Sequence, residues 1–473
     1  MIRARFAPSP TGYLHIGSAR TFIFNWLYVR KHHGTMVLRI DDTDADRNTA
    51  ASLQSIYDGL NWLGLNWDEL YRQSERLDNH RKLAHELLAK DLAYRDFTPA
   101  APDLEDRPHE DGPWLCNPAM SRLSKEESAA RAAAGEPFVI RFRVPRERPA
   151  EIAFKDEVYG PQSKLTADIE DFALLRSNGM PTYHLASCAD DIDLKITHII
   201  RGQDHLSNTF KHILIFHAAG IPLPRFAHLP LLTAPDGSKL SKRRHGPVVS
   251  VTTYRDYGFL ALAYINFLCL LGWSPKDDRE QMTLYELTSA FSFEGVHRSN
   301  AVVNFSESDP IDPKALWLNA QHLRSLPVDQ IAPLVRETLK AYELVPYGGE
   351  AFFTHEVDTI RTRFSTLLDF PTKGRAYFAD DYPIEPAALE KLNAPGAREL
   401  LHELADRIEA NPQFTEASVE AELRKLAEER GVKAGLLINA SRAALTGQTV
   451  GPSAFAVFVC VGRERVIQRL RRV

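Results

Sequence analysis

Residues 6–20, FAPSPTGYLHIGSAR, decide the fold that this sequence predicts. A short strand over residues 2–7 runs into this loop of prolines and a glycine, and a helix is expected over residues 16–31. His15 and Gly17 therefore lie where the carboxyl end of a strand meets a helix, which is where open parallel sheets bind ligands. A helix N-terminus attracts phosphate, Gly17 leaves room for an adenine base, and an imidazole can donate to a phosphate oxygen. The alternative is a strand-to-helix turn with a capping histidine.

Helices and strands alternate after this stretch. Residues 36–40 are typical of a buried strand, and helices are predicted over residues 51–63 and 76–88. The same pattern resumes at the strand 197–202 and continues through a helix over residues 205–219. Strand, helix and strand in this order indicate an α/β fold with a parallel, doubly wound sheet.

Two changes of pattern divide the chain, which at 473 residues is too long for one core. Residues 98–134 are rich in Pro, Asp and Glu and indicate an insertion, whereas helical periodicity dominates beyond Thr253. We therefore predict two halves of one α/β domain, an insertion between them and two helical domains, with boundaries at 1–96, 97–180, 181–252, 253–320 and 321–473.

The composition excludes several classes of protein. A hydrophobic fraction of 44% is ordinary for a globular chain, and no apolar stretch is long enough to span a membrane. The N-terminal residues have no apolar run typical of a signal peptide, so we expect a cytoplasmic protein without membrane partners. Cysteine spacing favours neither a disulfide framework nor a metal site, because the four residues lie far apart at Cys116, Cys188, Cys269 and Cys460.

Two basic clusters stand out against a net charge of −5. The first, GSKLSKRRHG at residues 237–246, follows a strand and a turn; Lys239 and Lys242 there could stabilise charge that builds on departing pyrophosphate. A solvated basic loop is the alternative. The second is the arginine-rich run at residues 462–473, for which RNA contact and a solvated helix face are equally good interpretations.

Together, the two elements resemble the HIGH and KMSKS signatures of class I aminoacyl-tRNA synthetases. The wider wording closely resembles glutamyl-tRNA synthetase of the bacterial type, in RFAPSPTGYLHIGSARTFIFNWL, LRIDDTD, PTYHLA, IRGQDHLSNT, RFAHLPLL and KLSKR. The resemblance covers nearly the whole chain and is strongest through about residue 275. It implies a Rossmann-like class I catalytic domain, an inserted acceptor-binding domain, a stem-contact domain and an all-α anticodon-binding region.

The resemblance also assigns residues to glutamate. It implies that Arg5, Ser9 and Arg201 bind the amino acid, and a guanidinium can pair with the side-chain carboxylate in a fork that glutamine cannot reproduce equally. Tyr183 matches a position that lines the amino-acid pocket, with a buried core tyrosine as the alternative. Asp41 would hold the substrate amino group. The family more often has glutamate at that position and often has asparagine where Ser187 stands, so the geometry around both residues is open.

For ATP, the resemblance implies binding by His15, Gly17, Lys239, Lys242 and Arg243, of which His15 and the two lysines are the catalytic residues. An extra arginine follows the KLSKR segment, so roles are not carried beyond Arg243. Mg²⁺ would be held mainly by the ATP phosphates. Some relatives bind zinc through cysteines of the insertion, but only Cys116 lies between residues 97 and 135, so no zinc and no protein-held metal are expected.

The implied reaction has two steps. L-glutamate attacks the ATP α-phosphate to give glutamyl-adenylate, and the 3′ end of tRNA(Glu) then takes the acyl group. The family implies that tRNA binds before efficient activation and that the enzyme is a monomer. By rough position, Arg361 and Arg363 would contact the anticodon, with surface charges on a helix as the alternative. Whether tRNA(Gln) is also charged stays open.

Other functions predict different features. Glutaminyl-tRNA synthetase has a first motif more like PEPNGYLHIGHAK and a largely β C-terminal half, and a truncated paralogue that glutamylates a tRNA base lacks the anticodon region. A small-molecule nucleotidyltransferase of the same fold would not need the helical half, and it would exchange pyrophosphate without RNA. An inactive RNA-binding relative would not turn over ATP.

Overall fold

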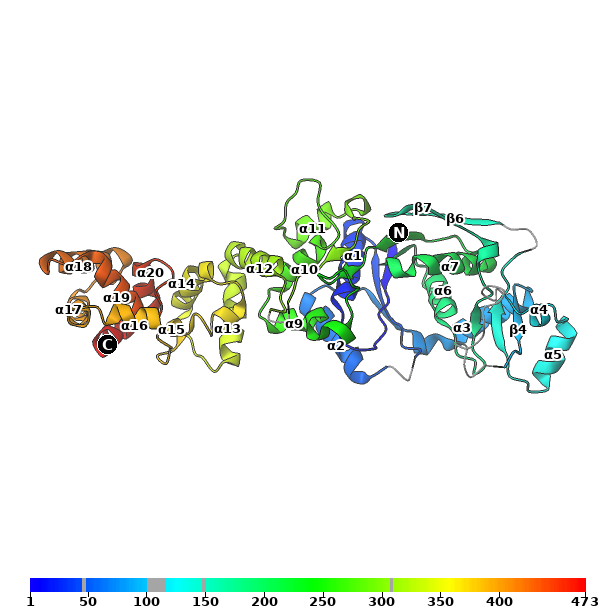
Figure 1. Ribbon diagram of the computed structural model, residues 1–473, viewed down its shortest axis with the longest axis horizontal. Coiled ribbons are helices and arrows are strands. Elements are labelled where there is room, and N and C mark those ends of the chain that lie inside the picture. The colour runs from blue at the N-terminus through cyan, green and yellow to red at the C-terminus, as the bar shows by residue number, and fades with distance from the viewer. Residues whose placement is uncertain (45–47, 100–115, 147–149, 307–308) are drawn as a thin grey trace. The chain divides into compact units, whose positions relative to one another are not determined.

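The computed structural model describes residues 1–44, 48–99, 116–146, 150–306 and 309–473 (Figure 1). The side chains of Lys242, Arg243 and Pro247 are outside this description. The chain forms two compact units. The first consists of Met1–Thr253 and Ile265–Pro310, and the second of Tyr254–Tyr264 and Ile311–Val473. Our predicted domain at 253–320 is therefore divided between the two units.

A seven-stranded sheet organises the first unit, in the order β3-β2-β1-β9-β10-β6-β7. All neighbours pair in parallel except β6 and β7, so the predicted parallel α/β sheet is confirmed. The strands are β1 (Arg3–Phe6), β2 (Thr35–Ile40), β3 (Glu69–Arg72), β6 (Glu151–Asp156), β7 (Gly160–Leu165), β9 (His198–Gly202) and β10 (Arg225–Leu229).

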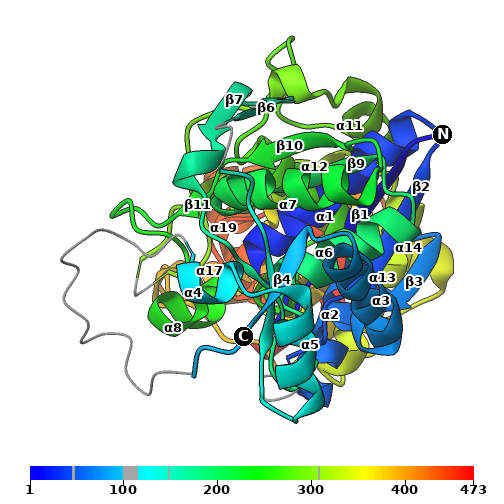
Figure 2. The same ribbon diagram turned by 90° about the vertical axis from the view of Figure 1, so that its right-hand side faces the viewer.

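The hairpin of β6 and β7 continues this sheet beyond β10 (Figure 2). Phe226 of β10 pairs with Asp156 of β6, so two strands that we placed in the insertion extend the main sheet. A separate antiparallel sheet takes two of its three strands from the same predicted insertion, which also holds the short helices α4 (Pro118–Ser121) and α5 (Lys125–Ala133), whereas its strand β4 precedes the predicted boundary. Its strands are β4 (Ala93–Asp96), β5 (Val139–Phe142) and β8 (Ala173–Leu175).

Helix α1 (Ile16–Lys31) packs on the central strands β1, β2 and β9. Its buried face carries Phe22, Ile23 and Leu27, which are fully shielded from solvent. The remaining helices that position the site include α3 and α7, both of which contact α6. Their bounds are α2 (Ala50–Leu63), α3 (Leu77–Ala89), α6 (Tyr183–Asp193) and α7 (Leu206–Ala219).

The rest of the first unit follows β10. Residues 232–233 form β11, which pairs in parallel with β12 (Ala301–Val302). The basic cluster begins in the turn after β11 and continues into the four-residue helix α8 (Lys242–His245). The last helices associated with this part of the chain are α9 (Val251–Asp256), α10 (Ala261–Leu270) and α11 (Leu284–Ala290).

The second unit is helical, and every strand among the described residues belongs to the first unit. One apolar core joins its helices, including Val357, Leu404, Leu445 and Val466, all fully buried. Its α-helices are α12 (Pro313–Ser325), α13 (Val328–Ala341), α14 (Glu350–Ile360), α15 (Arg375–Phe378), α16 (Pro386–Leu392), α17 (Ala397–Ala410), α18 (Glu416–Glu429), α19 (Ala434–Thr446), α20 (Ala454–Val461) and α21 (Arg463–Arg472). No helix among the described residues has the length and apolar character needed to span a membrane.

Most arginines of the terminal basic run have a structural role that neither sequence interpretation included. Arg465 and Arg469 are buried, and their guanidinium groups donate to the backbone carbonyls of Ala376 and Ala379. Arg463 donates to the carbonyls of Ile408, Glu409 and Asn411. Because these donors satisfy backbone carbonyls at loop and helix ends, they hold α21 against the rest of the helical unit.

Glu356 of α14 is a fully buried carboxyl group, and neither of its oxygens has a hydrogen-bond partner among the described residues. Burial raises its pKa well above the ordinary 4.5, against the attraction of Arg465 and Arg469. The native state therefore binds a proton that the unfolded chain releases above about pH 4.5. This group consequently lowers the free energy of unfolding as pH rises from that value toward its raised native pKa.

We expect Glu356→Gln to raise the free energy of unfolding of the full chain by about 1–2 kcal/mol at pH 8. The gain should shrink toward pH 4.5, where Glu356 is protonated in both states. Urea titrations at the two pH values measure it, with Glu390→Gln on the exposed side of α16 as the matched control. An equal gain at both pH values would show that ionisation of Glu356 is not the cause.

Candidate functional site

A cavity of about 410 Å³ opens where β1, β2 and β9 end and α1 begins. This is the position that parallel sheets use for ligand binding. It is lined by residues from both halves of the α/β sequence, and these include most of the predicted set: Arg5, Ser9, His15, Gly17, Asp41, Tyr183, Arg201 and Lys239. The predicted side chains of Lys242 and Arg243 lie outside the described residues.

His15 caps α1 from inside this cavity. Its Nδ1 accepts the backbone N–H of Gly17 at 3.0 Å, which leaves Nε2 to carry the ring proton when the imidazole is neutral. A Cβ on residue 17 would stand 3.3 Å from the same Nδ1, so glycine keeps this approach relaxed. The structure thus shows the capping contact, and the donor role of Nε2 stays a prediction.

Lys239 lies at the exposed side of the cavity, in the turn after β11. Its Nζ pairs with Asp204 at 2.8 Å, and both side chains are about half exposed, at 58% and 40%. The additional Arg244 pairs with Asp236 of the preceding turn at 2.7 Å. The ammonium group of Lys239 thus has an anionic partner. Because the pair is exposed and the lysine side chain is flexible, breaking this ion pair costs little free energy.

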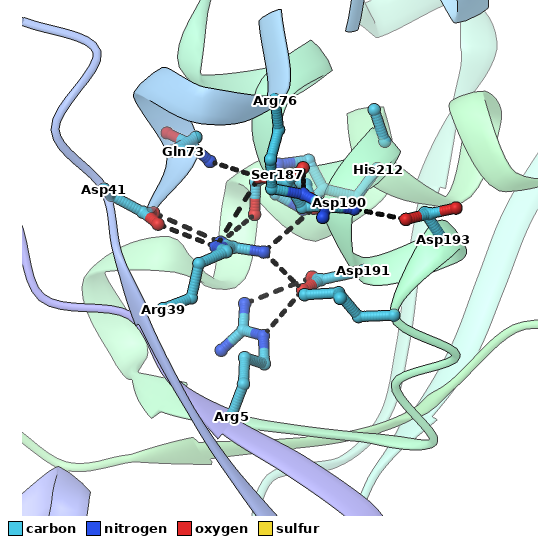
Figure 3. A network of polar contacts seen from close by, with 12 residues as sticks. Arg5, Arg39, Asp41, Gln73, Arg76, Ser187, Asp190, Asp191, Asp193 and His212 are labelled. Atoms are coloured by element: carbon cyan, nitrogen blue, oxygen red, sulfur yellow. Dashed lines mark hydrogen bonds and ion pairs between the residues drawn. The ribbon is translucent and has the colours of Figure 1, made fainter. Parts of the chain in front are cut away.

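A buried ionic network includes several residues that line the cavity (Figure 3). Arg5 and Arg39 share the carboxylate of Asp191, with shortest distances of 3.0 and 2.7 Å. Arg39 also makes a bidentate pair with Asp41 at 2.7 and 3.1 Å. Arg5 therefore has Nε and Nη2 occupied by Asp191 and offers only its Nη1 edge to a ligand.

Asp41 is held by Arg39 rather than left free. Burial raises the pKa of the Asp41 carboxyl group, while the Arg39 charge and hydrogen bond oppose that rise. Ser187 adds a longer contact, accepting from Arg39 at 3.4 Å. Our sequence reasoning missed Arg39, although a signal existed: it stands two residues before Asp41, which directly follows β2, and residues two apart along an extended segment share a face.

Arg201 differs from Arg5 and Arg39 because its partners are uncharged. Its guanidinium donates to the Tyr183 hydroxyl at 3.2 Å, to Thr209 at 2.8 Å, and to imidazole nitrogens of His212 and His228 at 3.3 and 3.2 Å. Within the part of the chain that the structure describes, no carboxylate lies within ion-pair distance of it.

The histidines around Arg201 are uncharged at neutral pH. Burial lowers the pKa of His205 to about 4, and burial together with the Arg201 charge lowers that of His212 well below its ordinary value. Burial also lowers the pKa of Arg201, because desolvation disfavours its charged form. A buried cation that lines the cavity and has only neutral partners, the His205 carbonyl among them, can attract an incoming carboxylate.

The site thus places the N-terminus of α1 and an exposed lysine in one cavity with a buried arginine that has no carboxylate partner among the described residues. A family model described as tRNA synthetases class I (E and Q), catalytic domain, matches residues 1–308, and one described as anticodon binding domain matches residues 321–473. The fold and the site therefore define a class I aminoacyl-tRNA synthetase.

Individual relatives define the family more narrowly than the family models do. The chain is 54% identical to glutamate–tRNA ligase of Solibacter usitatus, over 99% of this chain and 98% of the relative, and 39% identical to that of Thermus thermophilus, over 100% and 99%. A crystal structure of a glutamate tRNA ligase from Elizabethkingia meningosepticum in complex with its amino acid superposes with a TM-score of 0.85 at 30% identity, covering 100% of this chain and 98% of that one. The chain belongs to the glutamate–tRNA ligase family, which confirms the resemblance in the sequence.

Proposed function

We propose that this chain is a glutamate–tRNA ligase that activates L-glutamate with ATP and transfers the glutamyl group to the 3′ end of tRNA(Glu). The observation that carries the proposal is the buried, uncompensated Arg201 in the same cavity as His15 and Gly17. One end of the cavity selects a carboxylate side chain, and the other binds a phosphate chain. A cytoplasmic location and a monomeric state belong to the same proposal.

In the activation step, Arg201 and the Nη1 edge of Arg5 bind the side-chain carboxylate of glutamate, with the Tyr183 hydroxyl beside them. Asp41 receives the substrate amino group on the carboxylate that Arg39 already orients. The α-carboxylate of glutamate then attacks the α-phosphorus of ATP, and the bond to pyrophosphate breaks. No protein nucleophile is needed, because the positioning of the substrates and the stabilisation of charge in the transition state accelerate the reaction.

ATP is bound at the start of α1. The Nε2–H of His15 donates to a phosphate oxygen, and Gly17 admits the adenine. Lys239 leaves Asp204 and moves to the phosphates, where it stabilises the charge that builds on the leaving pyrophosphate. Lys242 and Arg243 are proposed for the same task from the sequence alone.

Magnesium enters this proposal with the nucleotide. Among the described residues, no group of three His, Cys, Asp or Glu side chains is placed to hold a metal ion. Mg²⁺ would be carried by the ATP phosphates. The absence of zinc remains a prediction from the sequence.

For tRNA binding, the two predicted arginines have different surroundings. Arg361 is buried and donates to the carbonyls of Leu323 and Leu326, with Asp358 at 2.6 Å, so its guanidinium serves the packing of the helical unit. Arg363 is exposed and lines a cavity of about 500 Å³ with Arg324 and Lys373. We retain Arg363 as the proposed RNA contact and withdraw Arg361, because its side chain is buried and held by Leu323, Leu326 and Asp358.

We expect Arg363→Ala to raise KM for tRNA(Glu) several-fold, with little change in KM for glutamate or ATP. A lost phosphate or base contact is worth about 1–2 kcal/mol and its effect should diminish at higher salt. Aminoacylation kinetics at two salt concentrations measure this, with the exposed Arg398→Ala as the matched control. Equal KM values for tRNA in the two variants would remove Arg363 from the proposed interface.

The proposed activity is tested by ATP–pyrophosphate exchange with glutamate or glutamine, each with and without purified tRNA(Glu). Exchange with glutamate that requires tRNA supports the proposal, and repeating it with tRNA(Gln) determines whether that tRNA is also charged. Exchange without any RNA would favour a small-molecule nucleotidyltransferase instead, and no exchange under any condition would favour an inactive relative.

A further inference from the structure

A buried carboxylate behind the amino-acid pocket is connected to Arg201 through one histidine. His228 of β10 is fully buried, and its Nδ1 lies 2.6 Å from Oδ2 of Asp156 on β6. Its other ring nitrogen, Nε2, lies 3.2 Å from Nε of Arg201 and 3.1 Å from the hydroxyl of Thr209. Asp156 and His228 do not line the cavity, so neither is placed to contact glutamate.

Every donor around Asp156 favours its ionised form. Its Oδ1 accepts the backbone N–H groups of Val158 and Tyr159 at 3.0 and 2.9 Å, and both oxygens lie near the backbone N–H of His228. Burial alone would raise the pKa of Asp156, but the hydrogen bonds from His228 and the backbone outweigh burial and lower it. Asp156 is therefore a carboxylate at neutral pH and can only accept.

An acceptor on one side of a neutral imidazole decides which ring nitrogen holds the proton. With the Asp156 carboxylate at Nδ1, the proton of His228 lies on Nδ1 and Nε2 is an acceptor. Burial lowers the pKa of His228, against the hydrogen bond that its Nδ1–H donates to Asp156, so the ring stays neutral. Nε2 can then accept the Nε–H of Arg201, which always donates.

We propose that Asp156 and His228 are positioning residues for glutamate: Asp156 fixes the tautomer of His228, and His228 holds the Arg201 guanidinium by its Nε. Thr209 holds Nη2 and His212 holds Nη1 from the same side, all with neutral groups. These contacts fix the orientation of the guanidinium without neutralising its positive charge, which can therefore attract the substrate carboxylate. A carboxylate in place of His228 would fix it equally well but would neutralise it, and the selectivity for glutamate over glutamine would fall.

This inference rests on the proposed role of Arg201, and the decisive variant is Asp156→Asn. The asparagine Oδ1 can keep the bonds from Val158 and Tyr159, whereas its amide nitrogen would donate to Nδ1 of His228. That reverses the tautomer and points an Nε2–H at the Nε–H of Arg201. The same logic of a wrong tautomer applies when a carboxylate beside a histidine becomes an amide in serine proteases. We expect KM for glutamate to rise at least about tenfold, with KM for ATP unchanged, in tRNA-dependent exchange.

His228 offers a matched pair of variants. His228→Leu removes the acceptor and should raise KM for glutamate as Asp156→Asn does. His228→Gln can present an amide oxygen to Arg201 and should be closer to the unmodified enzyme. The double variant Asp156→Asn with His228→Gln should bind glutamate better than Asp156→Asn alone, because an amide can turn to satisfy both neighbours. His198→Gln, in a buried histidine on the same strand as Arg201 but outside the cavity, is the control.

The outcomes separate this inference from the proposed function. An unchanged KM for glutamate in Asp156→Asn would overturn it, and so would parallel increases in KM for glutamate and ATP, which indicate general damage to the fold. If replacement of Arg201 itself leaves KM for glutamate unchanged, the proposed substrate role of Arg201 fails first. If Arg201 matters and both Asp156→Asn and His228→Leu do not, only the positioning role is lost.

Discussion

Arg201→Gln is expected to lower kcat/KM for glutamate by about 10³-fold. A bidentate, charge-assisted contact with a buried carboxylate is worth about 3–5 kcal/mol, since each hydrogen bond to a charged group contributes roughly 1.5–3 kcal/mol. The glutamine side chain retains polarity and much of the volume, so Tyr183, Thr209 and the neighbouring imidazoles keep a polar partner. The loss should therefore appear mainly in KM for glutamate and leave KM for ATP almost unchanged.

Steady-state exchange in the presence of tRNA(Glu), with glutamate and glutamine compared side by side, measures this effect. The variant should also lose preference for glutamate, because an amide in the pocket no longer favours a carboxylate. Tyr183→Phe is an informative companion: it removes one hydroxyl next to Arg201 and should cost about tenfold or less. If Arg201→Gln binds glutamate normally, the carboxylate of the substrate lies elsewhere in the cavity.

Lys239→Ala is expected to lower kcat for adenylate formation by about 10²–10³-fold, with a smaller effect on KM for either substrate. An ammonium group that stabilises charge only in the transition state affects kcat more than binding. Single-turnover formation of glutamyl-adenylate is the measurement that isolates this step. Lys155→Ala, an exposed lysine of β6 in the same unit, provides the matched control.

The ion pair of Lys239 with Asp204 provides a second test, in which replacing Asp204 should improve ATP binding. Asp204→Asn removes the resting partner of the ammonium group, so KM for ATP should fall by about two- to fivefold, the usual value of an exposed pair. A Lys239→Ala enzyme with normal single-turnover kinetics would mean that the lysine remains with Asp204 throughout the reaction. In that case Asp204→Asn should also leave KM for ATP unchanged.

The local parts of the site could be predicted from the sequence. A strand, a short loop and a helix in immediate succession fix His15 and Gly17 together, because few residues separate the elements. Asp41 and Arg201 came from the family resemblance, and their positions at the ends of β2 and β9 agree with the same rule, since parallel strands end at one edge of the sheet. Arg39 was missed although period-two spacing on a strand placed it beside Asp41.

The remaining contacts depend on pairings between distant segments. Asp156 meets His228 only because β6 pairs with β10, and we had assigned β6 to an insertion outside the main sheet. The burial of Arg361 and Arg465 could not be predicted from the sequence either, because a positive side chain in a helical segment is normally interpreted as a surface charge. Their partners are backbone carbonyls of other helices, and carbonyls leave no signal in the sequence.

The strand order also has a consequence for how the chain is made. β1 and β2 leave the ribosome early, but the partner on the other side of β1 is β9, where Thr197 meets Arg3 across 194 residues of chain. Until that partner is synthesised, β1 presents an open edge of unpaired backbone N–H and C=O groups, which can pair with a strand of another chain. Translation speed and chaperone supply over roughly the first 200 codons should therefore limit the yield of soluble enzyme more than its final stability does.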